Sequence, residues 1–207
     1  MSLLDLVMAL FMFASVLVVL VLVVRVAVLA ALGRWSRCRG AALVIGGYGG
    51  GYLAVLVAVS LVMPRRSFAP GERECFDDWC VAGVAVRPAA AEAPCAAEPG
   101  RRVWIATVEV SSDAKRVRQR ARDARAVLED RAGRWYEPCA APQGAHDLTD
   151  ELGPGEAFSV TVPFRLPEAA APAGVVVHHG AFPGALIIGD DQSLLHPPTL
   201  LGVAGGG

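Results

Sequence analysis

The chain has 207 residues, of which 54% are hydrophobic and 19% are charged. Soluble proteins average about 45–50% apolar and about 25% charged residues, so the composition argues against an ordinary cytosolic globule. The 19 basic and 20 acidic residues nearly cancel, which removes any global electrostatic argument for nucleic-acid binding. Nearly all the excess of apolar residues lies in the first 63 positions.

Two apolar runs in residues 1–63 predict a hairpin of two transmembrane helices, spanning about 4–32 and 41–63. A helix of about 20 residues covers the hydrocarbon core of a bilayer, and each run is that long. A cleaved signal peptide is the competing interpretation of the first run, but the run is too long, no basic residue precedes it, and a second run follows at once. Arg25 interrupts the first run near one end, where its long stem is expected to reach the headgroups; an ion or proton pathway is the alternative.

The arginines predict an orientation. Arg34, Arg37 and Arg39 lie in the connector between the runs, whereas the N-terminal flank carries only Asp5. The positive-inside rule therefore places the connector in the cytoplasm and both termini outside the cytoplasmic (inner) membrane. Arg65 and Arg66 follow the second run and argue for the opposite orientation. Four of the five cysteines follow the runs, an even number that suits an oxidising compartment.

A glycine-rich stretch in the second run predicts close helix packing. Gly46 and Gly50, and likewise Gly47 and Gly51, are four residues apart and leave one helix face without side chains. We expect the first helix to pack against this face, with self-association or a separate membrane subunit as the second alternative. A kink or local unwinding is a third.

Residues 64–74 are rich in proline, glycine and charge and predict a linker, and residues 75–207 predict an exported all-β domain. About seven short alternating segments with frequent turn residues indicate an antiparallel β-sandwich. They are 81–86, 102–111, 124–129 returning at 134–136, 158–166, 174–178, 185–188 and 199–203. The basic stretch 115–125 is interpreted as a solvated connection; a short helix or attraction to anionic headgroups is the alternative.

Five short motifs in this region carry a family resemblance: CFDDWC at 75–80, VEVSS at 108–112, DRAGRWY at 130–136, LGPGE at 152–156 and IIGDD at 187–191. Their order resembles a group of uncharacterised bacterial membrane-anchored or secreted immunoglobulin-like domains. The resemblance covers about residues 75–203 and implies an immunoglobulin-like sandwich in an exported location. It implies no catalytic residues, and likeness of fold alone does not establish a function.

The four exported cysteines allow three pairings. We favour Cys75 with Cys80 and Cys95 with Cys139, the first closing a short loop and the second a long one. A redox-active pair is the alternative, although four residues separate Cys75 from Cys80 and a thioredoxin-like motif has two.

No cofactor is expected, and the metal candidates are weak. The acidic pairs Asp77–Asp78 and Asp190–Asp191 could supply oxygen ligands to a calcium ion, but both lack the spacing of a calcium loop, and turn chemistry is the more common explanation of Asp190–Asp191. His178 and His179 are adjacent on an expected strand, so they point to opposite faces. Catalytic motifs such as Gly-x-Ser-x-Gly do not occur in the sequence, and we do not expect an enzyme.

The sequence therefore predicts a two-helix transmembrane hairpin that presents a non-catalytic interaction or structural module of the cell envelope. Trp79, Trp135 and Tyr136 are the candidate binding residues, because aromatic residues dominate protein contacts; core packing is the alternative. The expected partners are the lipid bilayer and an envelope or membrane protein, with no nucleic acid. A ligand- or metal-sensing protein coupled to a membrane partner, and a thiol-disulfide active protein, are the alternative functions.

Overall fold

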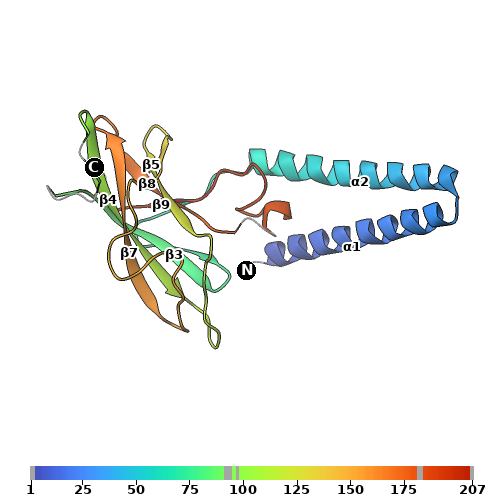
Figure 1. Ribbon diagram of the computed structural model, residues 1–207, viewed down its shortest axis with the longest axis horizontal. Coiled ribbons are helices and arrows are strands. Elements are labelled where there is room, and N and C mark those ends of the chain that lie inside the picture. Colours follow the sequence, from blue (N-terminus) through green and yellow to red (C-terminus); the bar gives the residue numbers. More distant parts are fainter. Residues whose placement is uncertain (1–2, 91–94, 97, 181–183, 206–207) are drawn as a thin grey trace. The chain divides into compact units, whose positions relative to one another are not determined.

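The computed structural model describes residues 3–90, 95–96, 98–180 and 184–205 (Figure 1). The chain divides into two compact units. The helical unit comprises Met1–Pro64 and Ala181–Pro197, and the sandwich unit comprises Arg65–Gly180 and Pro198–Gly207. The division differs from the expected boundary, because a late stretch of the chain belongs to the helical unit.

Two long helices form the first part of the helical unit, α1 (Leu3–Ala31) and α2 (Trp35–Val62). They run antiparallel and are joined by a tight turn. Both are long and apolar enough to cross a membrane, and only 12% and 6% of their most apolar windows are buried. Most apolar side chains of the two helices are therefore exposed.

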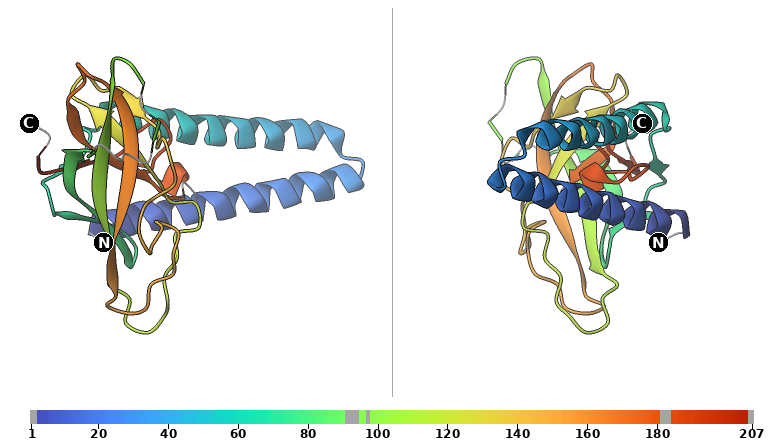
Figure 2. Two further views of the ribbon diagram at one scale, coloured as in Figure 1. Left: turned by 60° about the vertical axis from the view of Figure 1, so that its left-hand side comes forward. Right: turned by 90° about the vertical axis from the view of Figure 1, so that its right-hand side faces the viewer.

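Residues 184–197, which we call the docked segment, complete the helical unit. They begin with the 3-10 helix η1 (Gly184–Leu186), where a strand over 185–188 is expected from the sequence. Figure 2 shows η1, in orange-red, between the two helices. The prediction of a strand is wrong because four apolar residues in a row fit a strand and a packed loop equally well.

The sandwich unit consists of two β-sheets. A five-stranded sheet has the order β1-β9-β8-β5-β6, and a four-stranded sheet has the order β2-β3-β4-β7. All strand pairs are antiparallel except β1 and β9, which pair in parallel. The bounds are β1 (Ser67–Phe68), β2 (Arg73–Phe76), β3 (Trp79–Pro88), β4 (Arg101–Ser112), β5 (Arg125–Asp130), β6 (Trp135–Tyr136), β7 (Ala157–Pro167), β8 (Pro172–His178) and β9 (Leu200–Gly202).

The core lies between the sheets and follows the alternation of the sequence. On β4, Trp104, Ala106, Val108 and Val110 are all buried, as their shared face predicts. Side chains of the other sheet complete the core, among them Leu128, Val175 and Leu201. The predicted β-sandwich is confirmed.

The stretch 64–74, expected to be a linker, contains strand residues in both of its halves. Ser67 and Phe68 pair with Leu200 and Leu201, and Arg73 already pairs with Ala82. The stretch resembles a linker in composition, but main-chain hydrogen bonds to strands elsewhere in the chain order it. The basic stretch 115–125, by contrast, is largely an irregular, exposed connection, and only its last residue begins β5.

Candidate functional site

The hairpin of β5 and β6 forms the candidate site. Glu129 pairs with Trp135 across this hairpin, and β6 is an edge strand of its sheet. The turn between the strands forms because Gly133 adopts a positive φ of 75° and donates its N–H to the Asp130 carbonyl oxygen at 2.9 Å. The turn thus places two carboxylates and an aromatic pair on one short stretch of chain.

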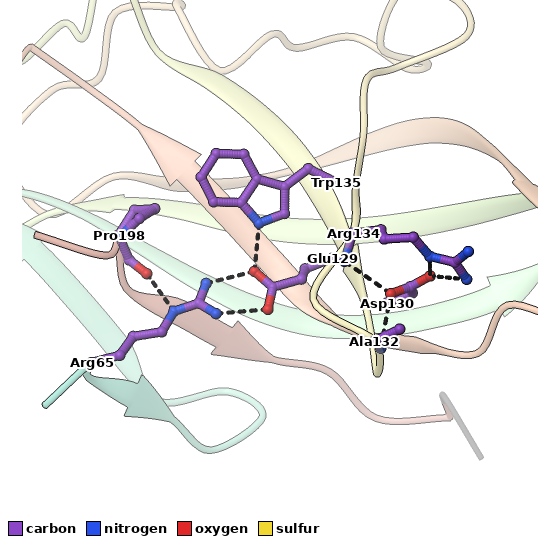
Figure 3. Close-up of polar contacts among 7 residues, drawn as sticks. All are labelled: Arg65, Glu129, Asp130, Ala132, Arg134, Trp135 and Pro198. Carbon is purple, nitrogen blue, oxygen red and sulfur yellow. Dashed lines mark hydrogen bonds and ion pairs between the residues drawn. The ribbon is translucent and has the colours of Figure 1, made fainter. Parts of the chain in front are cut away.

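Asp130 organises the turn (Figure 3). Its Oδ1 accepts the backbone N–H groups of Ala132 and Arg134 at 2.9 and 3.0 Å. Its Oδ2 accepts Arg134 Nε at 2.9 Å and the Tyr136 hydroxyl at 2.8 Å. Burial alone would raise the pKa of this carboxyl, but the four hydrogen bonds lower it to about 2. Asp130 is therefore a fixed anion that holds the hairpin together.

Glu129 connects the hairpin to the start of the sandwich unit. Arg65 Nη1 and Nη2 each lie 2.6 Å from a different oxygen of Glu129, and Trp135 Nε1 donates to Oε2 at 2.7 Å. Arg65 Nε also donates to the Pro198 carbonyl oxygen at 2.6 Å. The Arg65 hydrogen bonds are the largest influence on the Glu129 pKa, which is lowered despite burial. This forked pair ties residue 65 to β5 and to the chain just before β9.

Trp135 is the exposed member of this arrangement, which we call the Trp135 surface (Glu129, Asp130, Arg134, Trp135 and Tyr136). Its side chain is 49% exposed although its indole N–H is bonded to Glu129. The His178 ring packs edge-on against it with centroids 5.6 Å apart. Burial and the nearby Arg125 lower the pKa of His178, which favours the neutral ring. The indole is thus held in one orientation while half of its surface stays free.

The chemistry of the Trp135 surface suits binding. Both carboxylates are held ionised and accept hydrogen bonds from the protein itself, so they are poor general acids. A large aromatic side chain with restricted rotation loses little conformational freedom when a partner covers it.

Trp79, the third candidate binding residue, lies elsewhere. It is only 2% exposed and packs in the core near Phe76 and His179. Its indole Nε1 has no hydrogen-bond partner among the residues described by the structure. The structure thus brings Trp135 and Tyr136 together and separates Trp79 from them.

The cysteines form the favoured pairs, Cys75–Cys80 and Cys95–Cys139. Cys75 and Cys80 lie opposite each other on β2 and β3. Asp113 Oδ2 approaches Cys80 Sγ at 3.7 Å, so these three residues bring potential metal ligands close together. Sulfur atoms joined in a disulfide offer no thiolate to a metal, and the arrangement does not fit a metal site.

The weak metal candidates occupy turns. Asp77 and Asp78 form the two-residue turn of the β2–β3 hairpin, with φ of 61° at Asp77. Asp190 Oδ1 accepts the backbone N–H of Gln192 at 2.8 Å, in a turn of the docked segment that also contains Asp191. Asp190 therefore shows the turn chemistry that the sequence offered as the alternative, whereas Asp77 and Asp78 occupy a tight hairpin turn.

The glycine face of α2 lies open. A Cβ atom built at Gly46, Gly47, Gly50 or Gly51 would meet no other heavy atom within 4 Å. The expectation that α1 packs against these glycines is wrong, because larger side chains make the helix contact: Tyr48 bonds to Ser15. Packing against a separate chain stays a prediction.

Sequence reasoning missed Arg65, Glu129 and Asp130 as parts of a site. Asp130 could have been found, because an aspartate opening a turn that contains glycine commonly accepts nearby backbone N–H groups. The pairing of Arg65 with Glu129 has no local signal, since 64 positions separate them.

Comparisons with known proteins add a distant likeness. No protein-family model and no curated protein matches the chain. An uncharacterised β-sandwich protein of Clostridium difficile has a TM-score of 0.39 and 12% identity, with 56% of this chain and 88% of that chain covered. The secreted protein MPT63 of Mycobacterium tuberculosis has a TM-score of 0.42 and 17% identity, over 56% and 92%. A conserved hypothetical protein of Bacillus anthracis has a TM-score of 0.39 and 14% identity, over 53% and 89%. Likeness of this degree carries no argument about what this chain does.

Proposed function

We propose that the chain is a membrane-anchored, non-catalytic interaction module of the cell envelope, with an extracytoplasmic β-sandwich held by a transmembrane helical hairpin. The observation that carries the proposal is the exposure of the two helices. They are 29 and 28 residues long, and their apolar side chains are mostly uncovered by the rest of the chain. Apolar surface of this extent requires a lipid or protein environment.

The Trp135 surface is our candidate for the contact with an envelope protein. It supports this role because the exposed indole is fixed by Glu129 and His178 and lies on an edge strand. Edge strands and exposed aromatic side chains are recurrent elements of protein recognition.

Site-specific photo-crosslinking in bacterial cells tests this contact. A benzophenone amino acid at position 135 should give a discrete product with one envelope protein. The same probe at Val84 or Val117, which are exposed elsewhere in the sandwich unit, should not. Equal products from all three positions, or none from position 135 in a folded chain, would contradict the proposal.

A further inference from the structure

The contacts between α1 and α2 fix the levels of their residues along the hairpin. Tyr48 donates its hydroxyl to Ser15 Oγ at 2.8 Å, and the Tyr52 ring stacks on Phe11 with centroids 6.0 Å apart. Tyr52 follows Tyr48 by four residues in α2, and Phe11 precedes Ser15 by four residues in α1, as expected for antiparallel helices. A residue of α1 and a residue of α2 can therefore be assigned to the same level, by which we mean the same position along the axis of the hairpin.

Three arginines share one level near the tight turn. Cys38 Sγ lies 3.8 Å from the Val26 carbonyl oxygen. Arg25 directly precedes Val26, and Arg37 and Arg39 flank Cys38. Charged side chains avoid the hydrocarbon core and place their heads among the headgroups. If the hairpin spans the membrane as proposed, this level marks the cytoplasmic boundary of the core.

The depth of the other residues follows from that boundary. A core of about 30 Å corresponds to about 20 residues of helix, so it extends from Arg39 to about residue 60 of α2. Tyr52 then lies about 12 Å inside the outer boundary, at 1.5 Å per residue. A segment bound to α2 from Tyr52 to Ser60 therefore extends from about 12 Å inside the core to its outer boundary.

The docked segment is bound over this part of α2. Tyr52 donates its hydroxyl to the Leu186 carbonyl oxygen at 2.5 Å. The hydroxyl oxygens of Ser60 and Ser193 are 2.8 Å apart, and His196 Nδ1 lies 3.2 Å from the Ser60 carbonyl oxygen. Ser60, Ser193 and His196 are all buried. The polar groups of these residues thus satisfy one another away from the surface, as groups in a lipid environment must.

The outward side of the docked segment is apolar. Leu186, Leu194 and Leu195 are 38%, 42% and 60% exposed. Leu195 also has a φ of 67°, a conformation that L-residues rarely adopt. Three exposed leucines in one short segment are unfavourable in water, whereas an apolar surrounding would cover them.

The acidic residues of the docked segment lie near the end of α2. A Cβ atom at Gly189 would lie 3.7 Å from Met63 Sδ, and Asp190 and Asp191 follow Gly189. Met63 is beyond the calculated core, at the level of the headgroups. The segment therefore has its carboxylates at the polar level and Leu186 at the apolar level.

We propose that the docked segment is a third membrane element, which dips into the outer leaflet and places Leu186, Leu194 and Leu195 against lipid acyl chains. The inference rests on the proposed function, because it requires the hairpin to span the bilayer. Lipid is the occupant because the docked segment binds α2 at Tyr52 and Ser60, and the residues that follow these two, Leu53 and Leu61, are themselves exposed apolar side chains of α2.

Fluorescence quenching in phosphatidylcholine vesicles tests the proposal on the full chain. Cys38 is replaced by alanine, and the remaining cysteines are in disulfides. The fluorophore NBD is then attached to Leu195→Cys, to Leu17→Cys in the middle of α1, or to Val117→Cys in the sandwich unit. These side chains are 60%, 60% and 58% exposed, so the three positions are matched. Iodide on both sides of the membrane quenches labels in water, and a doxyl group high on the acyl chain quenches labels in the leaflet.

The proposal predicts that iodide quenches the label at 195 at least about fivefold less than the label at 117, while the shallow doxyl lipid quenches it more. Iodide quenching at 195 equal to that at 117, with position 17 protected, would overturn the proposal and leave the anchoring intact. Iodide quenching at position 17 would overturn the anchoring itself. Leu194→Cys supplies a second position should Leu195→Cys fail to fold.

Discussion

Two adjacent carboxylates at the end of β5 carry much of the local organisation of the sandwich unit. Glu129 and Asp130 are 5% and 2% exposed, yet both are ionised because each has several hydrogen-bond donors directed at it. Removing one partner of such a group leaves the others unsatisfied, which costs more than the hydrogen bond contributes. Single substitutions here should therefore have large effects.

Asp130→Asn should destabilise the chain by about 2–3 kcal/mol, because the amide cannot accept the Tyr136 hydroxyl and Arg134 as the carboxylate does. The pH dependence should change as well. The folded pKa of Asp130, about 2, lies below the ordinary value near 3.9. Its contribution is thus present above about pH 4 and is lost as the pH falls towards 2. Melting temperatures between pH 2 and 6 should fall less steeply for the variant; parallel curves would contradict the assignment.

Trp79 offers a second test, of a core residue that the sequence offered as a binding residue. Trp79→Ala should cost about 3–5 kcal/mol through the cavity that it leaves. Trp79→Phe should cost much less, since the buried indole N–H has no hydrogen-bond partner among the described residues. Denaturant unfolding of both variants measures the difference. A loss from Trp79→Phe as large as that from Trp79→Ala would contradict this expectation.

At the scale of elements, the two disulfides cross-link the chain over different lengths. Cys75 and Cys80 join neighbouring strands that a two-residue turn already connects. Cys95 and Cys139 are 44 positions apart, and Cys139 donates its N–H to the Pro163 carbonyl oxygen of β7. The second bridge therefore restricts the unfolded chain more than the first.

Replacing Cys95 and Cys139 by serine should accordingly cost about 4 kcal/mol, and replacing Cys75 and Cys80 about 2 kcal/mol, from the loop-closure entropy. Free energies of unfolding of the two double variants provide the comparison. A larger loss from the short loop would contradict the entropic explanation.

Two strands show which elements of the fold can be predicted from the sequence and which cannot. The strand at 158–166 was predictable because Val160, Val162, Phe164 and Leu166 recur at every second position and are all buried in the core. β1 was not predictable, because its two residues form a strand only by pairing with Leu200 and Leu201 at the far end of the chain. Local sequence patterns predict strands whose formation depends on neighbouring residues, but they do not predict strands that form only by pairing with residues far away in the sequence.

The same limit applies to the candidate site. Trp135 and Tyr136 were found because aromatic residues after a turn stand out. Their setting was not found, because Arg65 and His178 reach the hairpin from distant positions. The glycines of α2 show the opposite error, since their spacing predicted a contact with α1 that Tyr48 makes instead.

At the scale of the whole molecule, the proposed function requires that the connector and the sandwich unit lie on opposite sides of the membrane. Apolar helices of 29 and 28 residues, arginines gathered at the tight turn, and two disulfides in the sandwich unit all favour a cytoplasmic connector and an extracytoplasmic sandwich. The proposed envelope contact and the proposed lipid contact of the docked segment both require this arrangement.

Thiol labelling in intact bacterial cells tests that arrangement most directly. In a Cys38→Ala background, single cysteines replace Trp35 in α2 next to the tight turn and Val117 in the sandwich unit, two residues that are 68% and 58% exposed. A membrane-impermeant maleimide should label position 117 in intact cells and position 35 only after the membrane is permeabilised. Labelling of position 35 in intact cells, or protection of position 117 until permeabilisation, would contradict the account.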